Sequence, residues 1–99
     1  MDELTKELQT FLVRMRYQPE SVSHTITHNM EHLVRLLDAD DEEAVLHYFG
    51  ILGYEQLSLN EIAQERKLSP EDMMALIDRL LRRLAITPEW QMMKQSLKI

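Results

Sequence analysis

Three histidines, His24, His28 and His32, recur at four-residue intervals in the segment HTITHNMEH. In a helix this spacing places all three imidazoles on one face, with a drift of only about 40° per step. Two histidines four residues apart can bind a transition-metal ion. The apolar stripe of the same segment, which includes Ile26 and Leu33, lies almost opposite. We therefore expect an exposed polar face and no resident metal or other cofactor, with a metal site as the alternative interpretation.

No other pattern in the chain indicates catalysis. A nucleophile with a histidine and an orienting acid at motif spacing is absent, and two glycines in 99 residues do not make a phosphate-binding loop. The lack of cysteine excludes disulfides and thiolate metal sites. We expect a protein that is not an enzyme.

Length and charge define the class of protein further. Ninety-nine residues suit one compact domain, and the formal net charge of −6 makes binding to a polyanion less favourable. No apolar run approaches the roughly 18 residues of a membrane span, and the N-terminal MDELTKEL is acidic where a signal peptide would be basic. These features predict a cytoplasmic protein without a membrane partner.

The first half of the chain has the periodicity of two amphipathic helices. The first carries an apolar stripe from Leu4 to Met15, and Pro19 is well placed to begin the second, which we expect to run to about Leu37. Because their connection is short, the two helices should form an antiparallel hairpin over residues 1–38.

The second half predicts four helices, at about 41–49, 58–66, 70–84 and 88–97, with a loop at 50–56. Each of the last three starts with a capping residue: Ser58, Ser69 and Thr87. Trp90 should pack the last helix back onto the core. The expected fold is all-α, in one domain over residues 1–99.

The connection between Arg66 and Ser69 leaves room only for a tight corner. Apolar side chains lie on both sides of it, at Ile62 and Leu68, and Ala63 is small enough for a close helix crossing. Such a corner is typical of a DNA-reading helix-turn-helix, but it also occurs in ordinary helical bundles. The pattern by itself leaves both interpretations open.

Residues 49–84 resemble the promoter-reading C-terminal domain, region four, of bacterial RNA polymerase sigma factors. The acidic segment DEEAVL before them also fits that family, and the resemblance covers about residues 41–97. The matching elements are Phe49-Gly50-Ile51, the run LSLNEIA at 57–63, the corner Leu68-Ser69 and the run LLRRL at 80–84. The resemblance implies a helix-turn-helix over residues 41–97, on which the N-terminal hairpin would pack.

The chain departs from that family where the family contacts DNA. The reading helix of the family presents arginines and a glutamine, whereas this chain has Pro70, Asp72, Met74 and Ala75. Of the polar tip, only Ser69 and Glu71 remain. Fewer phosphate contacts and fewer bidentate donors predict weak binding and poor base readout.

Basic residues recur later on the same helix, at Arg79, Arg82 and Arg83, with Arg66 and Lys67 at the corner. They could contact phosphate or form a solvated face paired with nearby acids. Met73 should be buried by its spacing. Met74 should point outward, where a methionine could bind a partner protein adaptably.

Two hypotheses follow. The first is a small transcription-associated regulator that contacts DNA weakly, alone, as a homodimer or beside RNA polymerase. The second is a protein-interaction module on a helix-turn-helix scaffold that no longer reads DNA. The candidate DNA-binding residues are Lys67, Ser69, Glu71, Met74, Arg79, Arg82 and Arg83.

Overall fold

The structure, a computed structural model, describes residues 2–97, which form six α-helices, one short 3-10 helix and no strand. This confirms the all-α prediction. The helices in chain order are α1 (Glu3–Tyr17), α2 (His24–Val34), α3 (Ala39–Phe49), α4 (Leu59–Arg66), α5 (Pro70–Ala85) and α6 (Pro88–Leu97), with the 3-10 helix η1 at Pro19–Ser21. None of the helices over residues 2–97 is both long enough and apolar enough to cross a bilayer.

Helix α1 is stabilised by an N-cap at its start and by an apolar stripe that packs in the core. The Asp2 carboxylate accepts a hydrogen bond of 2.8 Å from the backbone N–H of Thr5, which satisfies one of the free donors at the start of the helix. The predicted stripe is buried, with Leu8, Phe11, Leu12 and Met15 all in the core.

The prediction of one continuous helix from Pro19 to about Leu37 is wrong at both ends. Pro19 begins the 3-10 helix η1, and α2 starts only at His24, where the Ser23 hydroxyl accepts from the backbone N–H of Ile26. The guanidinium of Arg14 donates to the hydroxyl and carbonyl of Ser21 and holds the turn in place. At the other end, the N–H groups of residues 36 and 37 bond three residues back, so the chain leaves the α-helix after Val34.

Helix α3 begins at Ala39, two residues before the predicted start, because Asp38 already has the extended backbone of an N-cap. It ends at Gly50, whose φ of 64° lies in the left-handed region. A Cβ at Gly50 would lie 2.6 Å from the Cβ of Gln56, so the turn requires glycine for two reasons. The predicted loop after it extends to Ser58.

The last three helices have the predicted caps. Ser58 and Glu61 form a full capping box, and the Ser69 hydroxyl accepts from the backbone N–H of Asp72 at 3.1 Å. Thr87 accepts from the backbone N–H of Trp90 at 3.2 Å, and α5 extends one residue beyond its predicted end, to Ala85.

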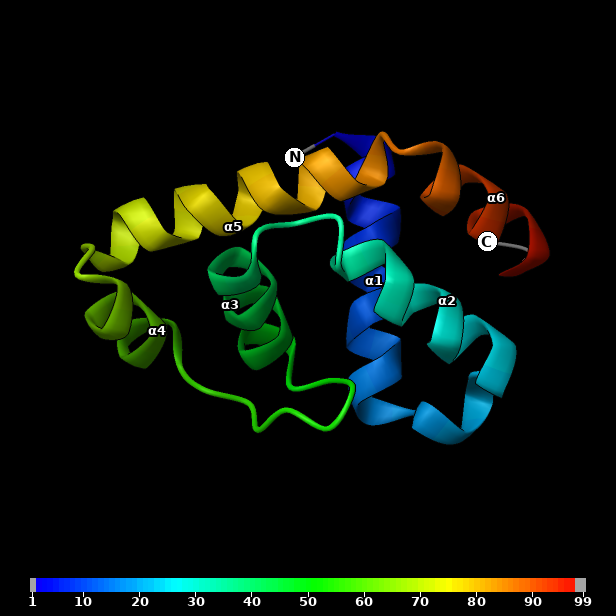
Figure 1. Cartoon of the computed structure of the whole chain (residues 1–99), viewed down its shortest axis with the longest axis horizontal. Helices are drawn as coiled ribbons and strands as arrows, with labels where there is room; N and C mark the ends of the chain where they lie inside the picture. The colour runs from blue at the N-terminus through cyan, green and yellow to red at the C-terminus, as the bar shows by residue number, and fades with distance from the viewer. Residues whose placement is uncertain (1, 98–99) are drawn as a thin grey trace.

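Helix α5 packs against four of the other helices: α1, α3, α4 and α6. Figure 1 shows it along the long axis, with α3 and α4 below its first half, α1 crossing its second half, and α6 at the far end with α2. One continuous core contains side chains from all six helices. Trp90 is completely buried, with its ring 6.0 Å from that of Phe11, so α6 packs back onto the core as predicted.

Candidate functional site

The corner between α4 and α5 consists of Lys67, Leu68 and Ser69. Lys67 adopts a left-handed conformation with a φ of 57°, and the N–H of Leu68 donates to the carbonyl of Ala63 at 2.9 Å. These bonds end α4 in the usual manner of a left-handed cap and turn the chain directly into α5. The short corner therefore places the start of α5 beside α4.

The arginine at this corner is engaged within the protein. The Nη2 of Arg66 lies 3.0 Å from Oδ1 of Asp41, and its Nη1 donates to the backbone carbonyl of Asp40 at 3.3 Å. Both side chains of the ion pair are largely covered. Arg66 thus joins α4 to the start of α3 and is not free to contact a phosphate.

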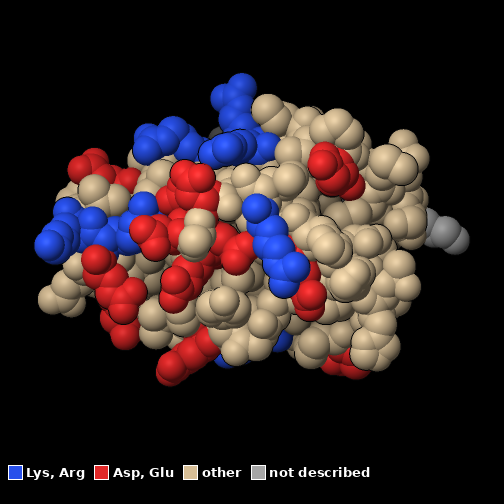
Figure 2. Space-filling model, in the orientation of Figure 1, with Lys and Arg blue, Asp and Glu red and all other residues tan. Residues whose placement is uncertain are grey.

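The exposed tip of α5 carries acids. Ser69, Glu71 and Asp72 are all exposed, and the first turn of α3 is acidic as well, with Asp40, Asp41 and Glu42. Residues 38–72 contain ten acids and two bases, of which one is the engaged Arg66. Figure 2 shows red side chains gathered over the half of the molecule where α3, α4 and the start of α5 lie. The electrostatic potential here is unfavourable for a phosphate backbone.

The prediction that the Met74 side chain points outward is wrong. The side chain is half-buried and packs against the core, and its sulfur accepts a hydrogen bond of 3.7 Å from the Tyr48 hydroxyl of α3. The periodicity of α5 places Met74 beside the buried face but does not reveal that a side chain from another helix covers it. Met73 is completely buried, as predicted.

The late arginines form a separate surface. Arg79, Arg82 and Arg83 are exposed, and Figure 2 shows blue side chains along the upper edge, above the second half of α5. The Nε of Arg82 lies 3.6 Å from a carboxylate oxygen of Asp2. From Glu71 to Arg82 the helix rises about 16 Å. The structure therefore divides the predicted DNA-binding residues between an acidic tip and a basic flank.

The surroundings of Asp2 change the pKa of its carboxyl group. Hydrogen bonds from Thr5, through its side chain and its backbone N–H, lower the pKa of the Asp2 carboxyl, and the positive charge of Arg82 lowers this pKa further. The N-cap of α1 is thus ionised more readily than an ordinary aspartate.

Two of the three histidines meet. The Nε2 atoms of His28 and His32 are 3.1 Å apart, and their rings lie edge to face. His24 is exposed and takes no part in this contact. Over residues 2–97 no group of three histidine, cysteine or acidic side chains is placed to hold a metal ion. The structure brings together a pair and not the predicted set of three.

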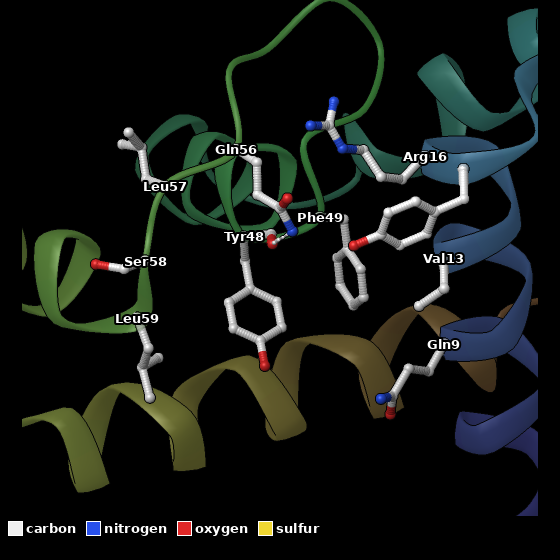
Figure 3. Close-up of a pocket in the computed structure, with 10 residues that line it drawn as sticks. Gln9, Val13, Arg16, Tyr48, Phe49, Gln56, Leu57, Ser58 and Leu59 are labelled. Carbon is white, nitrogen blue, oxygen red and sulfur yellow. Dashed lines mark hydrogen bonds between the residues drawn. The ribbon is translucent and has the colours of Figure 1, made fainter.

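A cleft of about 590 Å³ lies between α1 and the segment Gln56–Leu59, and the sequence had not indicated it. Figure 3 shows α1 side chains on one wall, this segment on the other, and Tyr48 and Phe49 between them. The lining comprises Gln9, Val13, Arg16, Tyr17, Tyr48, Phe49 and residues 56–59.

Among residues 2–97, Arg16 is the only charged residue that lines this cleft. It donates one long hydrogen bond, 3.4 Å, to the backbone carbonyl of Gly50, and among residues 2–97 it takes part in no ion pair. Most of its guanidinium donors therefore remain available. In the sequence, only the spacing of Gln9, Val13 and Arg16 along one helical face hinted that these side chains lie together.

A second hollow lies between α2 and α6 and is more apolar than the cleft beside Arg16. Its rim includes Leu36 and Met92, which are 46% and 72% exposed, and His32 lies at its edge. Of the acids within residues 2–97, Glu89 alone lines it.

The chain matches no protein-family model, and no curated protein or solved structure is significantly similar to it.

Proposed function

We propose that the chain is a helical protein-interaction module, built on a helix-turn-helix-like scaffold of α3, α4 and α5, that does not read DNA. It would act by binding and not as an enzyme. The observation that carries this proposal is the acidic tip of α5. Ser69, Glu71 and Asp72 occupy the place where a reading helix needs donors and positive charge.

The local packing supports the same conclusion. Arg66, the base closest to the tip apart from Lys67, is held by Asp41 and by the carbonyl of Asp40. Met74, which would lie in the groove of a bound duplex, is half-buried and accepts a hydrogen bond from Tyr48. A DNA-reading surface would therefore need to break contacts that stabilise the fold.

The partner surface we propose is the cleft beside Arg16. The Tyr48 hydroxyl and the Gln56 amide already donate within the protein, but the Gln9 carboxamide and the Tyr17 hydroxyl have no such bond over residues 2–97. With the Phe49 ring between the walls, these groups suit an extended peptide segment, whose main chain can bond with them. One guanidinium with free donors suits one carboxylate. The expected partner is thus a protein that inserts a segment with an acidic side chain or a free C-terminus.

The exposed arginines of the α5 flank favour a second candidate function, which is weak DNA contact. Arg79, Arg82 and Arg83 are exposed in the second half of α5, and Figure 2 shows basic side chains along the upper edge of the molecule. In this case, α5 would meet the phosphate backbone with its side and not with its tip. Only this flank supports the first of the two hypotheses from the sequence.

Fluorescence anisotropy separates the two candidates. The purified chain is titrated onto a labelled mixed-sequence duplex at low salt and again at about 0.15 M salt. We expect no binding at the higher salt. Binding at the higher salt would overturn the proposal in favour of DNA contact if it depends on the flank. It should then be lost when Arg79, Arg82 and Arg83 are all changed to glutamine and kept when Arg14, Arg16 and Arg35 are changed instead.

Site-specific photocrosslinking, in cells that produce the protein, tests the partner surface. A photoreactive residue is placed in turn at Gln56 in the cleft, Glu71 at the tip and Arg83 on the flank. We expect a protein adduct from Gln56 that disappears with Arg16→Glu and persists with Arg35→Glu, the matched control on an exposed site outside the cleft. An adduct that Arg16→Glu leaves unchanged would show that the cleft is not the partner surface.

A further inference from the structure

The pair His28 and His32 has the geometry of a chelate. Their Nε2 atoms are 3.1 Å apart, one helical turn from each other, and both side chains are exposed. When each nitrogen lies about 2.0–2.1 Å from a shared ion, the two nitrogens are about 2.9 Å apart if the nitrogen–metal–nitrogen angle is square and about 3.4 Å apart if it is tetrahedral. The observed separation lies between these two values.

We propose that His28 and His32 bind one divalent transition-metal ion of the class that prefers imidazole, namely Cu²⁺, Ni²⁺ or Zn²⁺. Hard ions such as Mg²⁺ and Ca²⁺ prefer oxygen ligands and are not expected here. The ion replaces the hydrogen bond between the two rings, so each Nε2 presents its lone pair to the metal.

Glu31 supports the required tautomer of His28. Its Oε2 lies 3.9 Å from Nδ1 of His28, the nitrogen on the side away from His32. The distance is too long for a hydrogen bond, but the negative charge on that side favours a proton on Nδ1, which leaves Nε2 free to bind the ion. The carboxylate also adds negative charge close to the ion.

The site is open, and two side chains leave further coordination positions to water or to another ligand. His32 also lines the hollow between α2 and α6, so that an additional ligand would enter beside Leu36 and Met92. The ion therefore lies at the edge of an exposed apolar surface and not in the core. This inference is independent of the proposed partner cleft, which lies on other elements.

Calorimetric titration of the tag-free full chain with ZnCl₂ and with CuSO₄ tests the proposal. We expect binding of one ion, tighter for Cu²⁺ than for Zn²⁺. Either His28→Gln or His32→Gln should weaken it at least about tenfold, since each removes one of two ligands. His24→Gln is the matched control, because it changes an exposed histidine on the same helix and should leave the affinity unchanged.

Two results would overturn the proposal. One is the absence of Cu²⁺ binding by the unaltered chain. The other is a loss with His24→Gln as large as that with His32→Gln, which would assign the ion to the whole histidine face. Histidine ring signals in nuclear magnetic resonance provide the second readout, since Cu²⁺ should broaden those of His28 and His32 before that of His24. Because all three positions are exposed, circular dichroism should show the same helix content for every variant.

Discussion

The guanidinium of Arg66 lies 3.0 Å from the carboxylate of Asp41, and this ion pair joins the end of α4 to the first turn of α3. The two side chains are 29% and 17% exposed, so the pair is partly shielded from water. The basic residue that precedes the corner thus stabilises the packing of the helices around α5. The same arrangement withholds its charge from any ligand at the tip.

Arg66→Ala should lower the free energy of unfolding by about 1–2 kcal/mol, because it removes a partly buried ion pair together with a hydrogen bond to the carbonyl of Asp40. Urea denaturation followed by circular dichroism measures this change. Lys67→Ala, one residue further on and exposed, should change it by less than about 0.5 kcal/mol. Equal effects of the two changes would mean that the ion pair does not stabilise the protein.

Gly50→Ala should destabilise the protein more than Gly53→Ala, by about 1–3 kcal/mol. Both glycines have a positive φ, so both changes introduce backbone strain. A Cβ at Gly50 would lie 2.6 Å from the Cβ of Gln56, whereas a Cβ at Gly53 meets nothing within 4 Å. The difference between the two midpoints in urea therefore reports the steric contact together with the difference in backbone strain between a φ of 64° and a φ of 86°. Equal midpoints would show that the loop moves to accommodate the methyl group.

Trp90→Phe should cost much less than Trp90→Ala. The indole is fully buried, and its Nε1 has no hydrogen-bond partner among residues 2–97, so phenylalanine loses volume but no hydrogen bond. We expect a loss of about 1–2 kcal/mol for phenylalanine and about 3–5 kcal/mol for alanine. Thermal unfolding by circular dichroism compares them. A phenylalanine variant as unstable as the alanine variant would indicate that the indole N–H has a partner after all.

Asp2→Asn should reduce stability at neutral pH and flatten its dependence on acid. The pKa of the Asp2 carboxyl is lowered in the folded protein, so its contribution to stability is present above the ordinary aspartate pKa of 3.8 and is lost as the pH falls through the folded value. The unaltered chain and the variant should therefore converge in stability below about pH 4. Urea midpoints measured at several pH values test this. Glu3→Gln, an adjacent exposed acid in the first turn, is the control and should leave the slope in this range largely unchanged. A difference between the unaltered chain and Asp2→Asn that persists undiminished below that pH would contradict the assignment.

Local patterns in the sequence determined much of the fold. The apolar stripe of α1, the capping residues Ser58, Ser69 and Thr87, and the length of α5 were all predictable, because each depends on residues within one or two helical turns. The absence of bases from the tip of α5 was equally visible, since it requires only the identity of the residues after Ser69.

The tertiary structure decided which of those residues are available. Arg66 was a candidate phosphate contact in the sequence, but it is bound by Asp41, 25 residues earlier. Met74 was expected to point outward, but it is half-buried against the core and accepts a hydrogen bond from Tyr48. The cleft beside Arg16 combines α1 with residues 48–59, which no periodicity relates. Such contacts join residues distant in the chain, so a pattern of neighbours cannot predict them, whereas packing of the helices fixes them.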